Sequence, residues 1–108
     1  LFGHYEGWRQ DFHGEHSKGV DSCQFVLTQD WKFIWYPVKD EYQLFHMPTD
    51  PNEMKNLITE ESYAPVIEEL TAKLVQYLQN RPEGFVKDGQ LHQVPVEMIR
   101  ATLYKEEA

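Results

Sequence analysis

The stretch from Gln43 to Leu57 constrains the fold of this chain most strongly, because it predicts a strand, a turn and a helix start in close succession. The alternation of polar and apolar residues in its first half is typical of a strand. Asp50 then stands three residues before Glu53, with Pro51 next to Asp50. This spacing predicts a capped helical turn, in which the carboxylate of Asp50 accepts from free amides and Glu53 reaches back to the cap.

Segments rich in aromatic and β-branched residues predict a small antiparallel sheet around this stretch. They are residues 23–28, 31–36 and 41–47, separated by short turns at 29–30 and 37–40. Within the second segment, alternation places Trp31, Phe33 and Trp35 on one face. Residues 11–13 offer a short further strand, so we expect three to four strands in meander order.

A helical period follows the sheet, between about residues 62 and 80. Its apolar side chains recur at spacings of three and four, at Val66, Ile67, Leu70, Leu74, Val75 and Leu78. Pro65 in the first turn suits a helix start. The predicted fold class is therefore α+β, a small antiparallel sheet of three to four strands with one long helix packed on one face.

The remaining segments predict one domain with short additions. A length of 108 residues suits a single domain over residues 1–108. Residues 1–8 are expected to be the tail of an upstream connection, and 85–108 a C-terminal extension. Asp88-Gly89 predicts a hairpin turn within that extension. A short helix is expected from 97 to 107, with Met98, Ile99 and Leu103 facing inward.

The charge balance excludes several classes of partner. Ten Lys and Arg residues against 18 Asp and Glu give a net charge of −8, which repels nucleic acid and anionic lipid. No apolar run approaches the roughly 20 residues of a membrane span. We expect a soluble chain without a targeting signal, in an unknown compartment. It opens with Leu1 rather than Met, so we also expect it to be a piece of a longer protein.

His13-Gly14-Glu15-His16 is the cluster that most resembles a functional site. Two imidazoles and one carboxylate within four residues could form a structural polar network, contact a substrate or bind a metal ion. The His-Glu-x-x-His spacing of zinc proteases is absent. In an extended segment His13 and Glu15 share a face while His16 points the opposite way, which suits a ligand contact better than a metal site.

Two stretches together resemble one enzyme family. Residues 43–57 resemble the Glu-Leu-Tyr-Asp-Leu…Asp-Pro-x-Glu…Asn-Leu signature of type I, formylglycine-dependent sulfatases, with Gln43 where many members carry Glu. The shared residues are Leu44, Phe45, Asp50, Pro51, Glu53, Asn56 and Leu57. The stretch Trp8 to His16 is similar to the start of the C-terminal subdomain in an arylsulfatase-like branch, as is the strand Lys32 to Trp35.

The resemblance implies a sulfuric ester hydrolase whose catalytic core lies outside this chain. The family uses a formylglycine nucleophile, a divalent cation (calcium), and Lys and His at the leaving oxygen. Cys23 lacks the Cys-x-Pro/Ala-Ser-Arg context of the formylglycine site and is expected to be a small buried strand residue. We therefore expect no catalytic residue, metal site or cofactor in this fragment, which alone should be inactive.

The resemblance also suggests what the fragment does in the complete enzyme. The catalytic domain would be its partner and would hold the calcium, and the full-length enzyme would act on a sulfate ester. His13, Glu15 and His16 would line the mouth of the substrate pocket as substrate-binding residues.

Alternative functions follow from the residues themselves. The chain could be a free-standing carbohydrate- or ligand-binding module, with Trp31, Trp35, Tyr36 and Tyr42 as a sugar-stacking platform, although such aromatic residues are more often core. A purely structural or dimerisation domain is a third possibility. Asp50 and Glu53 could suggest a calcium loop, but capping already explains them.

Overall fold

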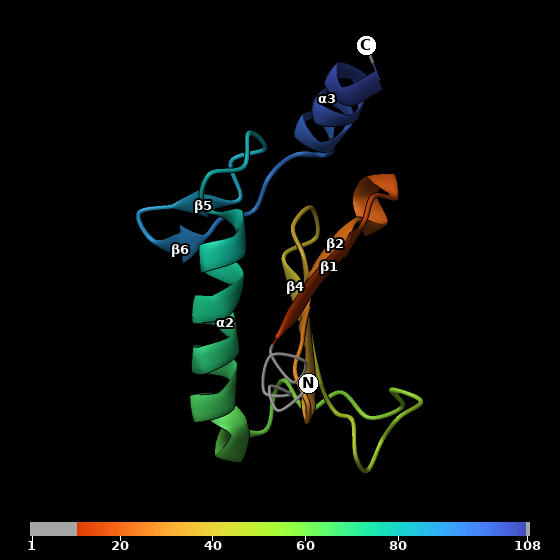
Figure 1. Cartoon of the computed structure of the whole chain (residues 1–108), viewed down its shortest axis with the longest axis vertical. Helices are drawn as coiled ribbons and strands as arrows, with labels where there is room; N and C mark the ends of the chain where they lie inside the picture. The colour runs from red at the N-terminus through yellow and green to blue at the C-terminus, as the bar shows by residue number, and fades with distance from the viewer. Residues whose placement is uncertain (1–10, 108) are drawn as a thin grey trace, which may run out of the picture.

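The computed structural model describes residues 11–107, with side chains described as far as residue 101. The proposed upstream tail (residues 1–8), Trp8 of the amino-terminal motif and the side chain of Leu103 therefore lie outside the described part. In chain order the elements are β1 Phe12–His16, η1 Gly19–Asp21, β2 Cys23–Leu27, β3 Trp31–Tyr36, β4 Glu41–His46, η2 Glu61–Tyr63, α2 Ala64–Leu78, β5 Val86–Lys87, β6 Gln90–Leu91 and α3 Val96–Glu107 (Figure 1).

The first four strands form one sheet in the order β1-β2-β3-β4, and each neighbouring pair is antiparallel. This meander confirms the predicted sheet and the α+β class. The further short strand expected at residues 11–13 is observed as β1, which continues to His16, opposite Cys23 of β2. The whole His13–His16 cluster thus lies on an edge strand rather than in a loop.

The two faces of the sheet bury different side chains. Phe33 and Trp35 are fully buried on the face toward α2, as the alternation predicts. Ile34 is buried on the opposite face with Cys23 and Phe45. The expectation that Cys23 is a small buried strand residue is therefore confirmed.

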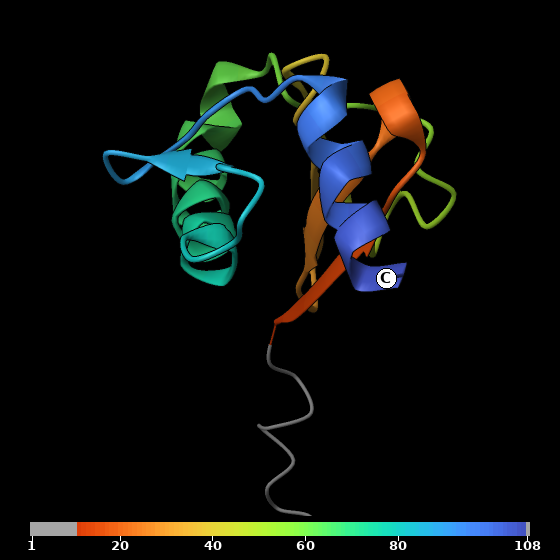
Figure 2. The same cartoon turned by 90° about the horizontal axis from the view of Figure 1, so that it is seen from above.

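Helix α2 covers one face of the sheet, as Figures 1 and 2 show from two directions. Its buried residues are Leu70, Leu74 and Leu78, which follow the predicted helical period. Pro65 lies in the first turn, where its missing N–H removes no intrahelical hydrogen bond. The main core therefore forms between these leucines and the inner side chains of β2, β3 and β4.

The predicted capped helical turn after β4 is confirmed for the acceptor Asp50 and wrong for Glu53. Asp50 does accept hydrogen bonds from the backbone amides of Met54 and Lys55, each at 2.9 Å, but no helix follows. Glu53 has φ +56°, a left-handed conformation that cannot continue a right-handed helix. Its carboxylate lies 2.9 Å from Nζ of Lys32 instead of reaching back to the cap. The local pattern thus predicted the acceptor Asp50 but not the partner of Glu53.

Asn56 attaches this loop to the outer edge of β4. Its Oδ1 accepts hydrogen bonds from the backbone amides of Leu44 at 2.9 Å and Ile58 at 3.1 Å. The amide of Leu57 donates to the carbonyl of Leu44 at 2.8 Å, and the Leu57 side chain is buried. The Asn-Leu pair of the signature therefore provides hydrogen-bond partners for the N–H and C=O of Leu44 at the free edge of the sheet, and Leu57 also contributes to the core.

The C-terminal segment packs against the same core. Asp88 and Gly89, with φ of +55° and +77°, form the predicted turn between β5 and β6. In α3, Ile99 is buried as expected, whereas Met98 is 38% exposed and only partly faces inward. Neighbouring helical residues point about 100° apart, so a side chain next to Ile99 lies off the centre of the buried face.

Candidate functional site

The candidate residues His13, Glu15 and His16 all lie on β1, but the structure divides them between two faces. Glu15 is opposite Gln24 of β2, and His16 is opposite Cys23. Side chains alternate along a strand, so His13 and Glu15 lie on the face covered by α2 and His16 on the other face. The three side chains therefore do not converge on one point.

On the α2 face, buried Gln24 links His13 to Glu15. Nε2 of His13 lies 2.8 Å from Oε1 of Gln24, and Nε2 of Gln24 donates to Oε1 of Glu15 at 2.7 Å. Nη2 of Arg81, just beyond α2, donates to the same carboxylate oxygen at 3.0 Å. We call His13, Gln24, Glu15 and Arg81 the β1–α2 network. Gln24 is only 4% exposed, so its amide is held away from bulk water.

Further contacts hold both ends of the β1–α2 network. Arg81 donates to both carboxylate oxygens of Glu83, at 3.2 and 2.9 Å, and its guanidinium lies over the ring of Phe85. At the other end, the His13 imidazole stacks on Tyr77 of α2, with ring centroids 4.9 Å apart and an interplanar angle of 17°. The network therefore fastens the edge strand to the C-terminal end of the helix.

The network keeps Glu15 and Arg81 charged. Partial burial acts to raise the pKa of Glu15, but the hydrogen bonds from Gln24 and Arg81 outweigh it, and the pKa is lowered. Burial acts to lower the pKa of Arg81, whereas the hydrogen bonds to Glu83 and Glu15 raise it, and the net direction is upward. The carboxylate of Glu15 and the guanidinium of Arg81 therefore stabilise each other's charged form.

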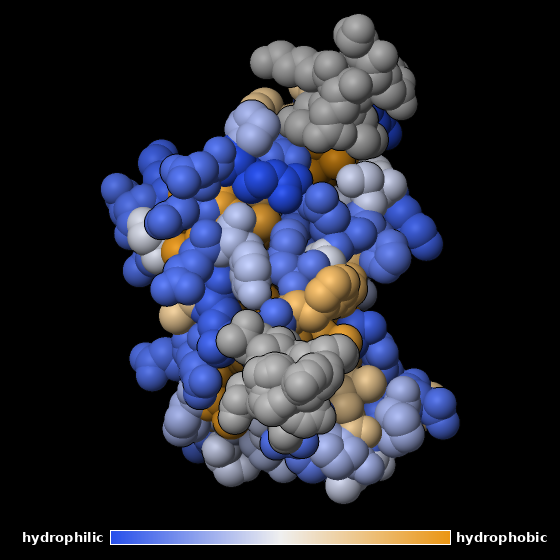
Figure 3. Space-filling model, viewed as in Figure 1, coloured by the Kyte–Doolittle hydropathy of each residue, from blue (hydrophilic) through white to orange (hydrophobic). Residues whose placement is uncertain are grey.

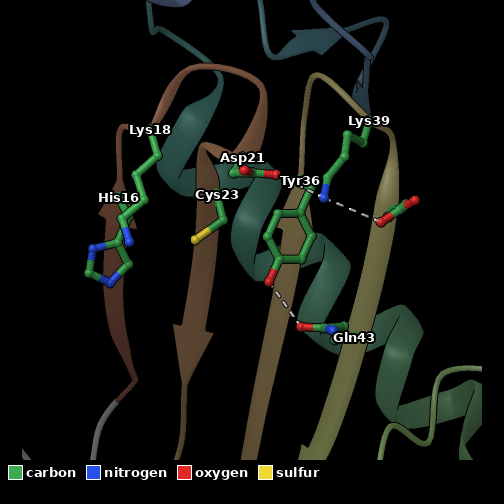
Figure 4. A pocket seen from close by; sticks show the side chains of 8 residues that line it. His16, Lys18, Asp21, Cys23, Tyr36, Lys39 and Gln43 are labelled. Atoms are coloured by element: carbon green, nitrogen blue, oxygen red, sulfur yellow. Dashed lines mark hydrogen bonds and ion pairs between the residues drawn. The ribbon is translucent and has the colours of Figure 1, made fainter.

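His16 lines a separate hollow of about 410 Å³ on the other face of the sheet (Figure 4). Its other lining residues are Lys18, Asp21, Cys23, Tyr36, Lys39, Glu41 and Gln43. Lys39 is paired with Asp21 at 3.0 Å and lies 3.8 Å from Glu41, so its charge is already compensated. Burial raises the pKa of the Cys23 thiol, which disfavours the thiolate needed for nucleophilic attack.

Within residues 11–101, no group of three or more His, Cys, Asp or Glu side chains could hold a metal ion. The oxygen ligands suggested for a calcium loop are engaged elsewhere, since Asp50 accepts backbone amides and Glu53 pairs with Lys32. The described residues thus do not fit the calcium that the sulfatase resemblance implies. Nor is any helix in that part of the chain long and apolar enough to cross a membrane.

The aromatic residues considered for a sugar-stacking platform belong mainly to the core. Trp35 is fully buried, and Trp31 and Tyr42 pack against the main core. Tyr36 packs against the smaller cluster on the opposite face. Figure 3 shows one side of the molecule, where hydrophilic residues dominate and apolar areas are small. The core interpretation is confirmed for Trp35, whereas Trp31, Tyr36 and Tyr42 are partly exposed.

Sequence reasoning missed Gln24, Tyr77 and Arg81. The signal for Gln24 was present, because it alternates with Val26 and so places a polar amide on the core face of β2. A buried amide needs hydrogen-bond partners, and Glu15 is directly opposite. Arg81 and Tyr77 carry no such signal, since only the packing of α2 brings them to β1.

Comparison with known proteins identifies the family. The model for the family described as N-sulphoglucosamine sulphohydrolase, C-terminal, matches residues 3–80, which include all of β1 to β4 and α2. The chain belongs to this family. The sulfatase resemblance of the signature at 43–57 is therefore confirmed.

Two relatives show where this sulphohydrolase C-terminal domain is found. The arylsulfatase of Clostridium perfringens (strain 13 / Type A) is 39% identical over 84 residues, which are 78% of this chain and 18% of the arylsulfatase. A solved structure of BT4656 in complex with its substrate D-glucosamine-2-N,6-O-disulfate is 30% identical, with a TM-score of 0.54. That match covers 68% of this chain and 16% of BT4656. The chain thus spans less than a fifth of each of these relatives.

The span matched by the family model contains three of the four residues of the β1–α2 network. The sulphohydrolase C-terminal model covers His13, Glu15, Gln24 and Tyr77 and ends at residue 80, immediately before Arg81. The guanidinium that holds Glu15 therefore comes from just beyond the matched span.

Proposed function

We propose that this sulphohydrolase C-terminal domain works as part of a sulfuric ester hydrolase, in which it supports the catalytic domain and forms one wall of the substrate pocket. The 39% identity to an arylsulfatase, of which the chain spans 18%, carries the proposal. The formylglycine motif does not occur in the sequence. The fragment alone is therefore expected to be inactive.

The part of the wall that we assign to substrate is the β1 segment His13–His16. Glu15 and His16 are exposed, and His13 is half-buried. The β1–α2 network and the stack on Tyr77 fix the imidazole of His13 on the scaffold. Groups held in this way lose little conformational entropy when they bind a ligand, which favours a role in substrate positioning.

The catalytic domain supplies the chemistry in this proposal. It would provide the formylglycine and the calcium, which polarises the sulfate group when bound. The substrate would be a sulfate ester. Since BT4656 binds a sulfated glucosamine, sulfated amino sugars are the first esters to examine besides aryl sulfates.

Turnover by the complete protein that carries this chain tests the proposal. We expect it to release sulfate from 4-nitrophenyl sulfate or glucosamine 6-sulfate faster than it releases phosphate from 4-nitrophenyl phosphate. The 108-residue chain alone should release none. His13→Ala should raise KM for glucosamine 6-sulfate about tenfold, as expected for the loss of one well-placed hydrogen bond.

Two results would contradict this function. A complete protein that hydrolyses neither sulfate ester, or that prefers the phosphate, would not be a sulfatase. Saturable and tight binding of neutral glycans by the isolated chain would instead favour the free-standing carbohydrate-binding module.

A further inference from the structure

The orientation of the Gln24 amide is determined by its neighbours. Oε1 of Glu15 can only accept a hydrogen bond when the carboxylate is ionised, and Arg81 also donates to it. The NH₂ group of Gln24 must therefore face Glu15 at 2.7 Å. The reversed amide would place two acceptor oxygens against each other. Carbonyl Oε1 of Gln24 consequently faces His13.

The fixed amide in turn determines which nitrogen of His13 carries a proton. Oε1 of Gln24 only accepts, so Nε2 of His13, at 2.8 Å, must donate. In the neutral imidazole this leaves Nδ1 as a hydrogen-bond acceptor. Within the described part of the chain, Nδ1 has no hydrogen-bond partner, while Tyr77 covers one face of the ring. Residues 11–101 thus leave this acceptor, on a ring held by Gln24 and Tyr77, without a partner at the edge of the sheet.

We propose that Glu15 and Gln24 are positioning residues for His13, and that Nδ1 of His13 accepts a hydrogen bond from a hydroxyl or amine of the substrate, away from its sulfate group. This inference rests on the proposed function, in which the β1 segment lines the substrate pocket. It assigns different roles within one cluster: His13 contacts the substrate, and Glu15 acts through Gln24. The expected substrate is therefore a sulfate ester that carries hydrogen-bond donors, such as a sulfated amino sugar.

Two substrates separate this role from a structural one in the complete protein. Glucosamine 6-sulfate offers hydroxyl and amine donors, whereas 4-nitrophenyl sulfate offers none. Gln24→Leu keeps a buried side chain of similar size but removes the partner of His13. We expect KM for glucosamine 6-sulfate to rise about tenfold with kcat little changed, and both constants for 4-nitrophenyl sulfate to stay as in the wild type.

Further variants provide a fallback and a control. Glu15→Gln removes the charge that orients the Gln24 amide and should raise KM for the sugar sulfate about threefold. If Gln24→Leu does not fold, Glu15→Gln tests the inference by the same comparison of KM for the two substrates. Gln93→Leu is the control for the same substitution at an exposed site, where it removes one hydrogen bond, from Nε2 of Gln93 to the carbonyl of Val38. Gln93→Leu should leave KM and kcat for both substrates as in the wild type.

A spectroscopic measurement reads the proton position directly. In the ¹⁵N spectrum of histidine-labelled protein, with the His13 signal assigned by its loss in His13→Ala, the wild type should show the Nε2–H form. Gln24→Leu should show a mixture of the two tautomers. An Nδ1–H form in the wild type would overturn the inference.

The kinetic outcomes separate this inference from the proposed function. Activity on neither substrate would refute the proposed function itself. Activity with equal losses on both substrates, or with no loss on either, would overturn the positioning role and leave the sulfatase assignment intact. The positioning role would also be overturned if KM of the wild type were no lower for glucosamine 6-sulfate than for 4-nitrophenyl sulfate.

Discussion

The substitution Asn56→Ala should destabilise the fold, although Asn56 lies in a loop without helix or strand. Its side-chain oxygen is the acceptor for the backbone amides of Leu44 and Ile58. Leu44 is fully buried on the edge strand β4 while Asn56 is in place. Removing the Asn56 side chain, which is itself exposed, takes away the protein acceptor of the Leu44 amide.

The magnitude follows from these two amides. A buried backbone N–H without a partner costs about 1–3 kcal/mol, and the half-buried amide of Ile58 adds about 0.5–1.5 kcal/mol. The contact from Nδ2 of Asn56 to the carbonyl of Tyr42 is long, at 3.4 Å, and should add little. We expect the free energy of unfolding to fall by about 2–4 kcal/mol, a large part of the 5–15 kcal/mol that is usual for a domain.

Urea unfolding followed by tryptophan fluorescence measures this change, because Trp35 is fully buried in the folded state. Asn52→Ala is the matched control, since Asn52 is exposed in the same loop and its replacement should change stability by less than about 0.5 kcal/mol. If Asn56→Ala were no more destabilising than Asn52→Ala, the reasoning about the sheet edge would be refuted.

Three further predictions concern the sheet, the core and the network. Gly14→Ala should lower the free energy of unfolding by about 1–3 kcal/mol, because the added Cβ would overlap the Phe25 ring across the strand pair. A double-mutant cycle with Phe25→Ala should remove most of this penalty, and a purely additive cycle would contradict the explanation. Leu74→Ala should cost about 2–5 kcal/mol in urea unfolding, since Leu74 is fully buried, and a loss below about 1 kcal/mol would show that the site collapses. The lowered pKa of Glu15 means that its ionised form stabilises the fold above about pH 4.5, and that this stability is lost as pH falls through the lowered pKa. Glu15→Gln should therefore reduce stability at pH 7, and a gap to the wild type that does not close in urea unfolding near pH 3 would disprove the role of this charge.

The sequence predicted most elements because their signals are local. Alternation placed Phe33 and Trp35 on one face of β3, and Asp88-Gly89 selected the hairpin turn that the structure contains. After β4 the pattern predicted the acceptor Asp50 but not the partner of Glu53, which is Lys32, distant in sequence. Local spacing cannot identify such a partner, since it depends on where β3 lies in the folded sheet.

The candidate site was predicted only in part. The alternation correctly separated His13 and Glu15 from His16, because side-chain direction along a strand is a local property. No local pattern indicated that Arg81 would donate to Glu15, since 66 residues separate the two.

By itself, the sequence determined the class of fold, the sulfatase family and the elements that build the sheet and the long helix. Only the tertiary structure decided what the family signature does, because Asn56 and Leu57 acquire their roles from the free edge of β4. It also decided that Gln24 links His13 to Glu15. Periodicity is set by neighbouring residues along the chain, whereas a buried polar group is satisfied by whichever donors and acceptors the packed elements bring to it.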